Sequence, residues 1–188
     1  MLTGRGRYVS DWNLPGQAYA HFVRSDRAHA EFSVQKEEAL KARGVIAVIT
    51  GDELDLKSLP AALPAKGRGG MELINPGRPA LAKGRVRFAG DALALIVAES
   101  ATAAQDAAEL LTVEYRELPA VVTAKEALAP DAPLVHDAVP GNMVLDYESG
   151  DEGRTREAFA RAARVVRLEV DISRVVGNPM EPRACLGA

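Results

Sequence analysis

Residues 85–98, RVRFAGDALALIVA, contain the pattern that decides the fold class. Residues 85–88 alternate charged and apolar side chains, residues 92–98 are almost wholly apolar, and Gly90-Asp91 supplies a turn between them. Short apolar runs of this kind predict strands, and a nearly continuous run predicts burial on both faces. We therefore expect residues 92–98 to form the central strand of a sheet.

The sequence that follows predicts a helix and a further strand. Ser100 is a good N-cap for a helix over residues 101–111, where alanines occupy one face and permit close packing on a sheet. Residues 112–118 alternate again, as a half-buried strand does. Mixed strands and helices in this order predict an α+β fold.

Upstream, residues 17–35 predict two extended segments, either a hairpin or a crossing pair, which would let His21 and His29 face each other. Residues 36–43 favour a helix ending at Gly44, and residues 45–49 a buried strand. Residues 58–84 are rich in proline and glycine, which indicates a long loop.

Downstream, a short helix is expected over residues 123–128, and residues 130–142 contain three prolines, typical of a linker or a surface strap. Residues 151–163 favour an amphipathic helix, and residues 166–172 alternate most clearly of all, as a strand.

These patterns predict a first domain over residues 1–130, a linker over residues 131–150, and an incomplete second domain over residues 151–188. Because few residues follow the strand at 166–172, we expect an exposed edge and apolar face there. Either self-association, as a homodimer, or disorder of this segment would follow.

The composition is that of a globular protein. Of 188 residues, 47% are hydrophobic and 26% charged, so a packed core is expected. The net charge of −3 disfavours nucleic-acid binding. The basic first residues lack the apolar core of a signal peptide, and no apolar run is long enough to span a membrane, so cytoplasmic localisation is expected.

Candidate sites are few, and no catalytic residue is expected in this chain. Nucleophile-elbow, Walker and dinucleotide-binding motifs are missing from the sequence. The single cysteine, Cys185, excludes an internal disulfide, a thiolate zinc site or an iron–sulfur cluster formed by this chain alone. His21, His29 and His136 show no ligand spacing, so no metal site is predicted.

A glycine-rich loop at Lys66, Gly67, Arg68, Gly69 and Gly70 has two interpretations. Exposed N–H groups and flanking cations could hold an anion, with further basic residues nearby at Arg78, Lys83, Arg85 and Arg87. A solvated loop, or one that meets a partner subunit, is the interpretation we favour, because no strand-to-helix context surrounds it.

Residues 178–183, NPMEPR, form the most unusual local motif. Two prolines bracket Glu181 and fix the backbone around it. Rigidly placed charge suits a site lining as well as a structural turn. The candidate residues for such a site lining are Asn178, Glu181 and Arg183.

Seven motifs together resemble the large-subunit family of molybdenum hydroxylases, which includes carbon monoxide, xanthine and aldehyde dehydrogenases. The sequence departs from the family pattern at two places. Asp26-Arg27 stand where proline and histidine are common in the family, and Asp91-Ala92 stand where glutamate and proline are common. The motifs, in chain order, are LTGRGRY (2–8), LPGQAYAHFVRS (14–25), GVIAVITGDEL (44–54), RPALAKGRVRFAGDALALIVAE (78–99), AAELLTVEYRELPAV (107–121), PLVHDAVPGN (133–142) and NPMEPRA (178–184).

The resemblance implies an α/β hammerhead domain followed by the beginning of the first molybdopterin-binding domain. It implies that the intact subunit hydroxylates CO, an aldehyde or a purine or heteroaromatic ring with water-derived oxygen. Molybdopterin in its cytosine dinucleotide form would be bound by the remainder of the large subunit, and 2Fe-2S clusters and FAD by a small and a medium partner subunit. This chain alone would bind no cofactor and contribute scaffolding, with Asn178, Glu181 and Arg183 as the candidate residues for supporting the cofactor cavity.

Two other functions are compatible with the sequence. A free-standing interaction or assembly module could use the hammerhead fold without joining an active site. A small anion- or nucleotide-binding protein could use the cations between Lys66 and Arg87, and its ligand binding would be sensitive to salt.

Overall fold

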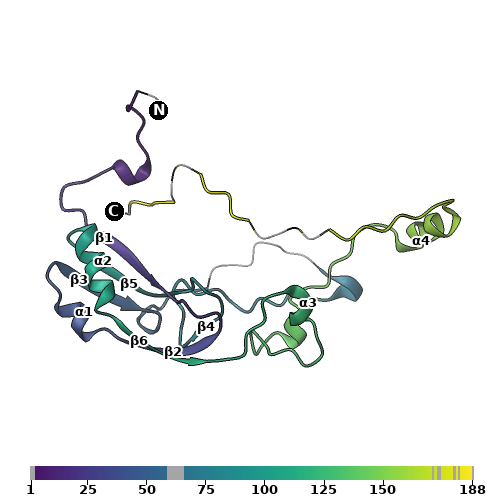
Figure 1. The fold of residues 1–188 in the computed structure, drawn as a ribbon, viewed down its shortest axis with the longest axis horizontal. Coiled ribbons are helices and arrows are strands. Elements are labelled where there is room, and N and C mark those ends of the chain that lie inside the picture. Colours follow the sequence, from purple (N-terminus) through teal and green to yellow (C-terminus); the bar gives the residue numbers. More distant parts are fainter. Residues whose placement is uncertain are drawn as a thin grey trace. The chain divides into compact units, whose positions relative to one another are not determined.

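A computed structural model describes residues 3–58, 66–170, 172, 175–179, 181 and 183–187 (Figure 1). The chain divides into two units, one formed by Ala18–Glu148 and the other by Met1–Gln17 with Ser149–Ala188. We describe each unit by itself.

The first sheet of the 18–148 unit has the order β1-β5-β3, with all neighbours antiparallel. Its strands are β1 (Tyr19–Arg24), β3 (Val45–Thr50) and β5 (Ala92–Ala98). The prediction that residues 92–98 form a central strand is confirmed. Their nearly continuous apolar sequence suits a strand with neighbours on both sides.

The second sheet has the order β4-β2-β6, again antiparallel. Its strands are β2 (Ala30–Gln35), β4 (Arg85–Val86) and β6 (Thr112–Glu117). The hairpin alternative for residues 17–35 is wrong, because β1 and β2 belong to different sheets. Alternation fixes which face of a strand is buried but not which strand pairs with it.

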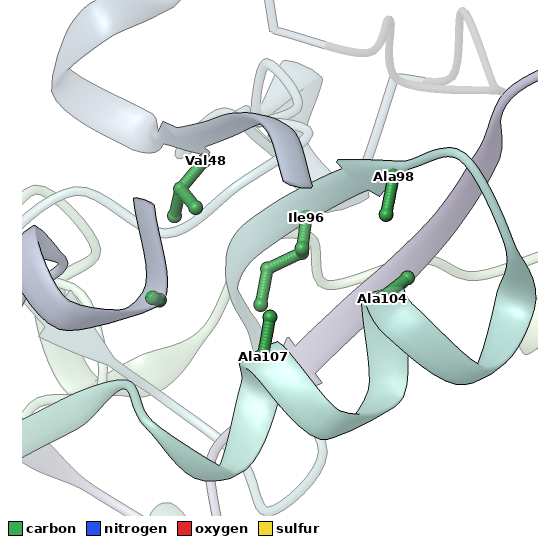
Figure 2. Close-up of a cluster of buried hydrophobic side chains, with 6 residues drawn as sticks. Val48, Ile96, Ala98, Ala104 and Ala107 are labelled. Carbon is green, nitrogen blue, oxygen red and sulfur yellow. The ribbon is translucent and has the colours of Figure 1, made fainter. Parts of the chain in front are cut away.

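Helix α2 (Ala101–Glu109) packs on the first sheet, and the Ser100 side chain accepts a hydrogen bond from the Ala103 N–H, as predicted. The shorter α1 (Glu37–Lys41) contributes Ala39. Figure 2 shows the resulting cluster, in which the small side chains on α2 let the helix lie close to the sheet. Its fully or almost fully buried members are Ala39, Val48, Ile96, Ala98, Ala104 and Ala107.

A second cluster of buried side chains lies against the β4-β2-β6 sheet and consists of Ala30, Ala82, Val86 and Leu93. Strand β5 therefore contributes to both clusters, with Ile96 in the first and Leu93 in the second. Successive strand residues point to opposite faces, so odd and even positions of β5 can serve different cores. The pairing with β1 shifts between Val23 and Arg24, where a bulge is formed.

Short helical turns and a surface strap complete this unit. They include the 3-10 turns η2 (Gly51–Glu53), η3 (Arg68–Gly70) and η4 (Pro140–Asn142), and the short helix α3 (Ala124–Ala127) capped by Thr123. The strap over residues 128–148 is held by Asn142, whose side chain accepts from the Val135 N–H and donates to two carbonyl groups. The compact unit thus extends through the strap to Glu148.

The other unit contains the turn η1 (Val9–Asp11) and α4 (Glu152–Arg161), which confirms the expected helix, with Asp151 as its N-cap. All residues of α4 are exposed. The predicted strand at residues 166–172 is wrong for the described part of this segment, since residues 165–170 and 172 have no strand structure. A strand needs a hydrogen-bonded neighbour, and no described residue pairs with this segment.

Candidate functional site

One hollow of the 18–148 unit is a cavity of about 590 Å³ that we call the arginine cavity. Four of its lining residues are arginines. They are Arg24 on β1, Arg78 in a loop, Arg85 on β4 and Arg87 immediately after β4. Its walls are Phe22, Arg24, residues 75–80, Ala82, Arg85, Arg87, Phe88, Asp91, Ala92 and His136.

Strand β1 places Phe22 and Arg24 on the same face, because residues two apart along a strand point the same way. The Arg24 guanidinium carbon lies 5.6 Å from the centroid of the Phe22 ring, a cation–π arrangement. Arg24 Nη1 donates to the Gly90 carbonyl at 2.9 Å. One wall of the cavity therefore combines an aromatic ring with a positioned cation.

Arg85 is neutralised by two carboxylates. Its guanidinium lies 3.5 Å from Glu31 on the paired strand β2 and 3.1 Å from Asp137 on the strap. Glu31 is also bonded to Arg116 on β6, and the hydrogen bond from Arg116, together with the charges of both arginines, holds the pKa of Glu31 below its usual value. Arg85 thus ties together the second sheet and the strap and contributes little free charge.

Arg87 is fixed by the backbone, since its Nε donates to the Val135 carbonyl at 3.0 Å. Arg78 differs from the other three arginines, because it makes no hydrogen bond or ion pair to another described residue. It is exposed at the cavity wall. Its guanidinium donors are available to a ligand.

Two further titratable groups line the cavity. Burial raises the pKa of Asp91, and the hydrogen bond from the Arg87 N–H opposes that rise. Burial and the positive charge of Arg87 lower the pKa of His136. A neutral imidazole is therefore favoured at His136 near pH 7, and the permanent positive charge of the cavity comes from its arginines.

The other two histidines do not meet. His21 lies on β1, whereas His29 precedes β2, so the idea that they face each other across paired strands is wrong. His29 is buried, with Nδ1 2.7 Å from the Pro119 carbonyl and with no hydrogen-bond partner for Nε2 within the described chain. No set of three or more His, Cys, Asp or Glu residues in the described chain is arranged for a metal ion.

The glycine-rich loop is bound to the strap. The Arg68 N–H donates to the Asp146 carbonyl, and its guanidinium lies 3.4 Å from Asp146 and 3.3 Å from Glu148. A side chain at Gly67 would overlap the Asp146 carbonyl and lie 2.9 Å from Leu145. This close approach explains why residue 67 is a glycine. Arg68, the cation that a bound anion would need, is already paired with the two carboxylates.

The candidate residues of the 178–183 motif lie in the other unit and are all exposed. Glu181 accepts a hydrogen bond from the Val9 N–H at 3.1 Å, while Asn178 and Arg183 make none with another described residue. Their support of a cofactor cavity stays a prediction.

Part of the arginine cavity could be found from the sequence. The sequence shows Arg78, Arg85 and Arg87 as neighbouring cations, but it does not connect them with the other lining residues Phe22, Arg24, Asp91 and His136. The spacing of two between Phe22 and Arg24 was a usable signal for a shared face. Their meeting with Arg78 depends on the pairing of β1 with β5, which no local pattern reveals.

The family can be decided by comparison with known proteins. Residues 3–119 match the family model described as "Aldehyde oxidase and xanthine dehydrogenase, a/b hammerhead domain". The chain belongs to the aldehyde oxidase and xanthine dehydrogenase family. The expected α+β hammerhead fold is thereby confirmed, and the two sheets described above are those of a hammerhead domain.

Individual members of this family agree over most of the chain. The nicotine 6-hydroxylase large subunit of Paenarthrobacter nicotinovorans is 34% identical over 189 residues, which cover 99% of this chain and 22% of the relative. The crystal structure of quinoline 2-oxidoreductase from Pseudomonas putida 86 covers 76% of this chain, with a TM-score of 0.67, 38% identity and 18% of its own chain covered. The Cu,Mo-CO dehydrogenase structure covers 87%, with a TM-score of 0.70, 31% identity and 21% of its own chain covered.

The chain therefore corresponds to the hammerhead region of molybdenum hydroxylase large subunits and spans about a fifth of the length of the nicotine 6-hydroxylase large subunit. Within the described part of the chain, no helix has both the length and the apolar character required to cross a membrane.

Proposed function

We propose that this chain acts as the non-catalytic hammerhead part of a molybdenum hydroxylase large subunit. The observation that carries the proposal is the coverage: 34% identity extends over 99% of this chain but over only 22% of the nicotine 6-hydroxylase large subunit. The remaining length of such a subunit would hold the reaction centre, and this chain would provide a rigid surface for it.

The charged residues of the 18–148 unit support a structural role. Glu53 completes a capping box with Thr50 and pairs with Lys36, and Glu31 bridges Arg85 and Arg116. Each of these carboxylates is engaged by cations or backbone N–H groups. Such carboxylates hold elements together and are poorly suited to proton transfer.

For the intact protein, we propose oxidative hydroxylation of CO, an aldehyde or a heteroaromatic ring with water-derived oxygen. Molybdopterin in the cytosine dinucleotide form would be the cofactor of the large subunit. A small subunit with 2Fe-2S clusters and a medium subunit with FAD would accept the electrons. The cytoplasm is the proposed location, and the domain limits at residues 130 and 150 belong to the same proposal.

The size of the native polypeptide tests the first step. An antibody raised against residues 18–148 should detect a polypeptide several times larger than 20.0 kDa in cells that express the gene. A single band near 20 kDa would contradict the proposal and support the free-standing module instead.

The purified native complex tests the second step. Elemental analysis should find molybdenum and iron, and the absorption spectrum should show flavin. Reduction of an artificial electron acceptor with nicotine, quinoline, CO, benzaldehyde or xanthine would identify the substrate class. A large polypeptide that lacks molybdenum in every preparation would count against the enzyme assignment.

A further inference from the structure

The arginine cavity contains more positive charge than its own carboxylates neutralise. Arg85 is paired with Glu31 and Asp137, which leaves Arg24, Arg78 and Arg87 facing one lining carboxylate, Asp91. The whole chain has a net charge of −3, so this excess is local. A positively charged hollow attracts an anion.

Three cavity arginines are positioned differently toward such an anion. Arg87 and Arg24 are each anchored by a backbone carbonyl, at 3.0 Å and 2.9 Å, and so are held in place. Arg78 makes no hydrogen bond or ion pair to another described residue and keeps all five of its N–H donors, while its charge acts at longer range on Asp91. A planar guanidinium of this kind binds a carboxylate through two parallel hydrogen bonds.

The walls next to these cations are apolar. Phe22 and Phe88 line the cavity with 45% and 53% of their surface exposed, and Pro76 and Pro79 contribute further apolar surface. An inorganic anion would leave these rings in water, whereas a flat apolar group would cover them. The volume of about 590 Å³ falls within the range of about 300–1,000 Å³ typical of small-molecule sites.

We infer that the arginine cavity binds a small aromatic carboxylic acid, with its carboxylate on Arg78 and Arg24 and its ring against Phe22 and Phe88. Burial of the ring and the charge-assisted hydrogen bonds act together in this site. This inference does not rest on the proposed function, because it concerns only residues of the 18–148 unit.

The test uses the full 188-residue chain, labelled with ¹⁵N and titrated with sodium benzoate. We expect saturable shifts of the amide resonances of Arg78, Asp91 and Ala92. Benzyl alcohol, which keeps the ring but lacks the charge, should shift them much less. Sodium phosphate, which keeps the charge but lacks the ring, should also bind more weakly.

Two variants separate the site from general attraction. Arg78→Ala should weaken benzoate binding about 10-fold through loss of a charge-assisted pair. Lys125→Ala removes one positive charge from exposed α3, outside the cavity, and should leave the affinity unchanged. Arg24→Ala provides a second test of the cavity if Arg78→Ala does not keep a native spectrum.

Several results would overturn the inference. Shifts that do not saturate, or that sodium chloride reproduces at equal ionic strength, would mean that no site exists. An equal response to benzyl alcohol would remove the role of the arginines. An equal loss of affinity in Lys125→Ala and Arg78→Ala would show that only overall charge matters.

Discussion

Strand β5 and residues 166–170 with 172 were both expected to form strands from their apolar residues, but their surroundings are opposite. In β5, which pairs with a strand on each side, Ile96 and Ala98 are fully buried in the cluster beneath α2, and Leu93 is fully buried in the second cluster. In the other segment, Val166 is 91% exposed and Ile172 is 85% exposed. A stretch rich in apolar residues therefore supplies surface that can be buried, while the rest of the fold must supply the strands and helices that bury it.

The largest expected difference in the free energy of unfolding comes from truncating one apolar side chain in each segment to alanine. Ile96→Ala leaves a cavity beneath α2 and should lower the free energy of unfolding by about 3 kcal/mol. Leu168→Ala, in the exposed segment, should change it by less than about 0.5 kcal/mol. Urea unfolding followed by circular dichroism measures both, and equal losses would break the comparison.

Substituting one glycine by alanine in each unit should change stability in opposite directions. A Cβ at Gly51 would overlap the Ala82 carbonyl oxygen, so Gly51→Ala should destabilise the 18–148 unit by about 2 kcal/mol. At Gly153 in α4 the new Cβ would meet only Asp151 Oδ1, at 3.5 Å. Gly153→Ala should therefore increase the helical signal at 222 nm, worth up to about 1 kcal/mol in helix propensity. A stabilising Gly51→Ala would contradict the described packing.

The N-caps of α2 and α4 have the same geometry but should stabilise different amounts of the protein. Ser100→Ala removes the cap of α2 and should lower the stability of the whole 18–148 unit by about 1 kcal/mol, because α2 covers the sheet. Asp151→Ala removes the cap of exposed α4 and should lower helix content without moving the main thermal transition. A shift of that transition by Asp151→Ala would mean that α4 is coupled to the core.

The smallest effect concerns pH. The hydrogen bond from Lys36, followed by those from the Thr50 N–H and hydroxyl, lowers the pKa of Glu53 to about 2. Since the folded pKa lies below the usual value of 4.5, this contribution is complete above pH 4.5 and disappears as the pH falls toward 2. Glu53→Gln should thus cost less than about 1 kcal/mol at pH 7, because the carboxylate is about half exposed, and clearly less near pH 2.

Thermal melts of Glu53→Gln between pH 2 and 7 check this dependence. Glu157→Gln in α4, which removes a surface ion pair with Arg161, is the matched control. It should leave the transition of the 18–148 unit unchanged across the same range. A difference for Glu53→Gln that does not shrink between pH 7 and pH 2 would exclude ionisation as its cause.

Local signals predicted most elements of the fold. Ser100 and the alanines after it predicted α2, and Thr123 preceded the short helix α3, because caps and helical spacing act within a few residues. The assignment of β1 and β2 to different sheets could not be predicted in this way. Pairing depends on contacts between distant residues, such as Phe22 with Leu95 and Phe32 with Tyr115.

The same limit applies to the candidate site. Arg85 and Arg87 were recognised as neighbouring cations, but their role depends on partners elsewhere, such as Glu31, Asp137 and Val135. The sequence could not distinguish the neutralised Arg85 from the unpaired Arg78. The strand prediction for residues 166–172 was wrong for the same reason. A strand can be assigned only when its hydrogen-bonded neighbours are known.

The central position of β5 also determines when this unit can fold during translation. Tyr19 pairs with Ala98, and Ala30 pairs with Glu117, so the first two strands leave the ribosome long before their partners exist. Folding of the unit during translation can therefore be completed only after residue 117 has emerged. A pause in translation before residue 92 would prolong the exposure of unpaired strands to chaperones and to aggregation, whereas a pause after residue 148 would give the finished unit time to close.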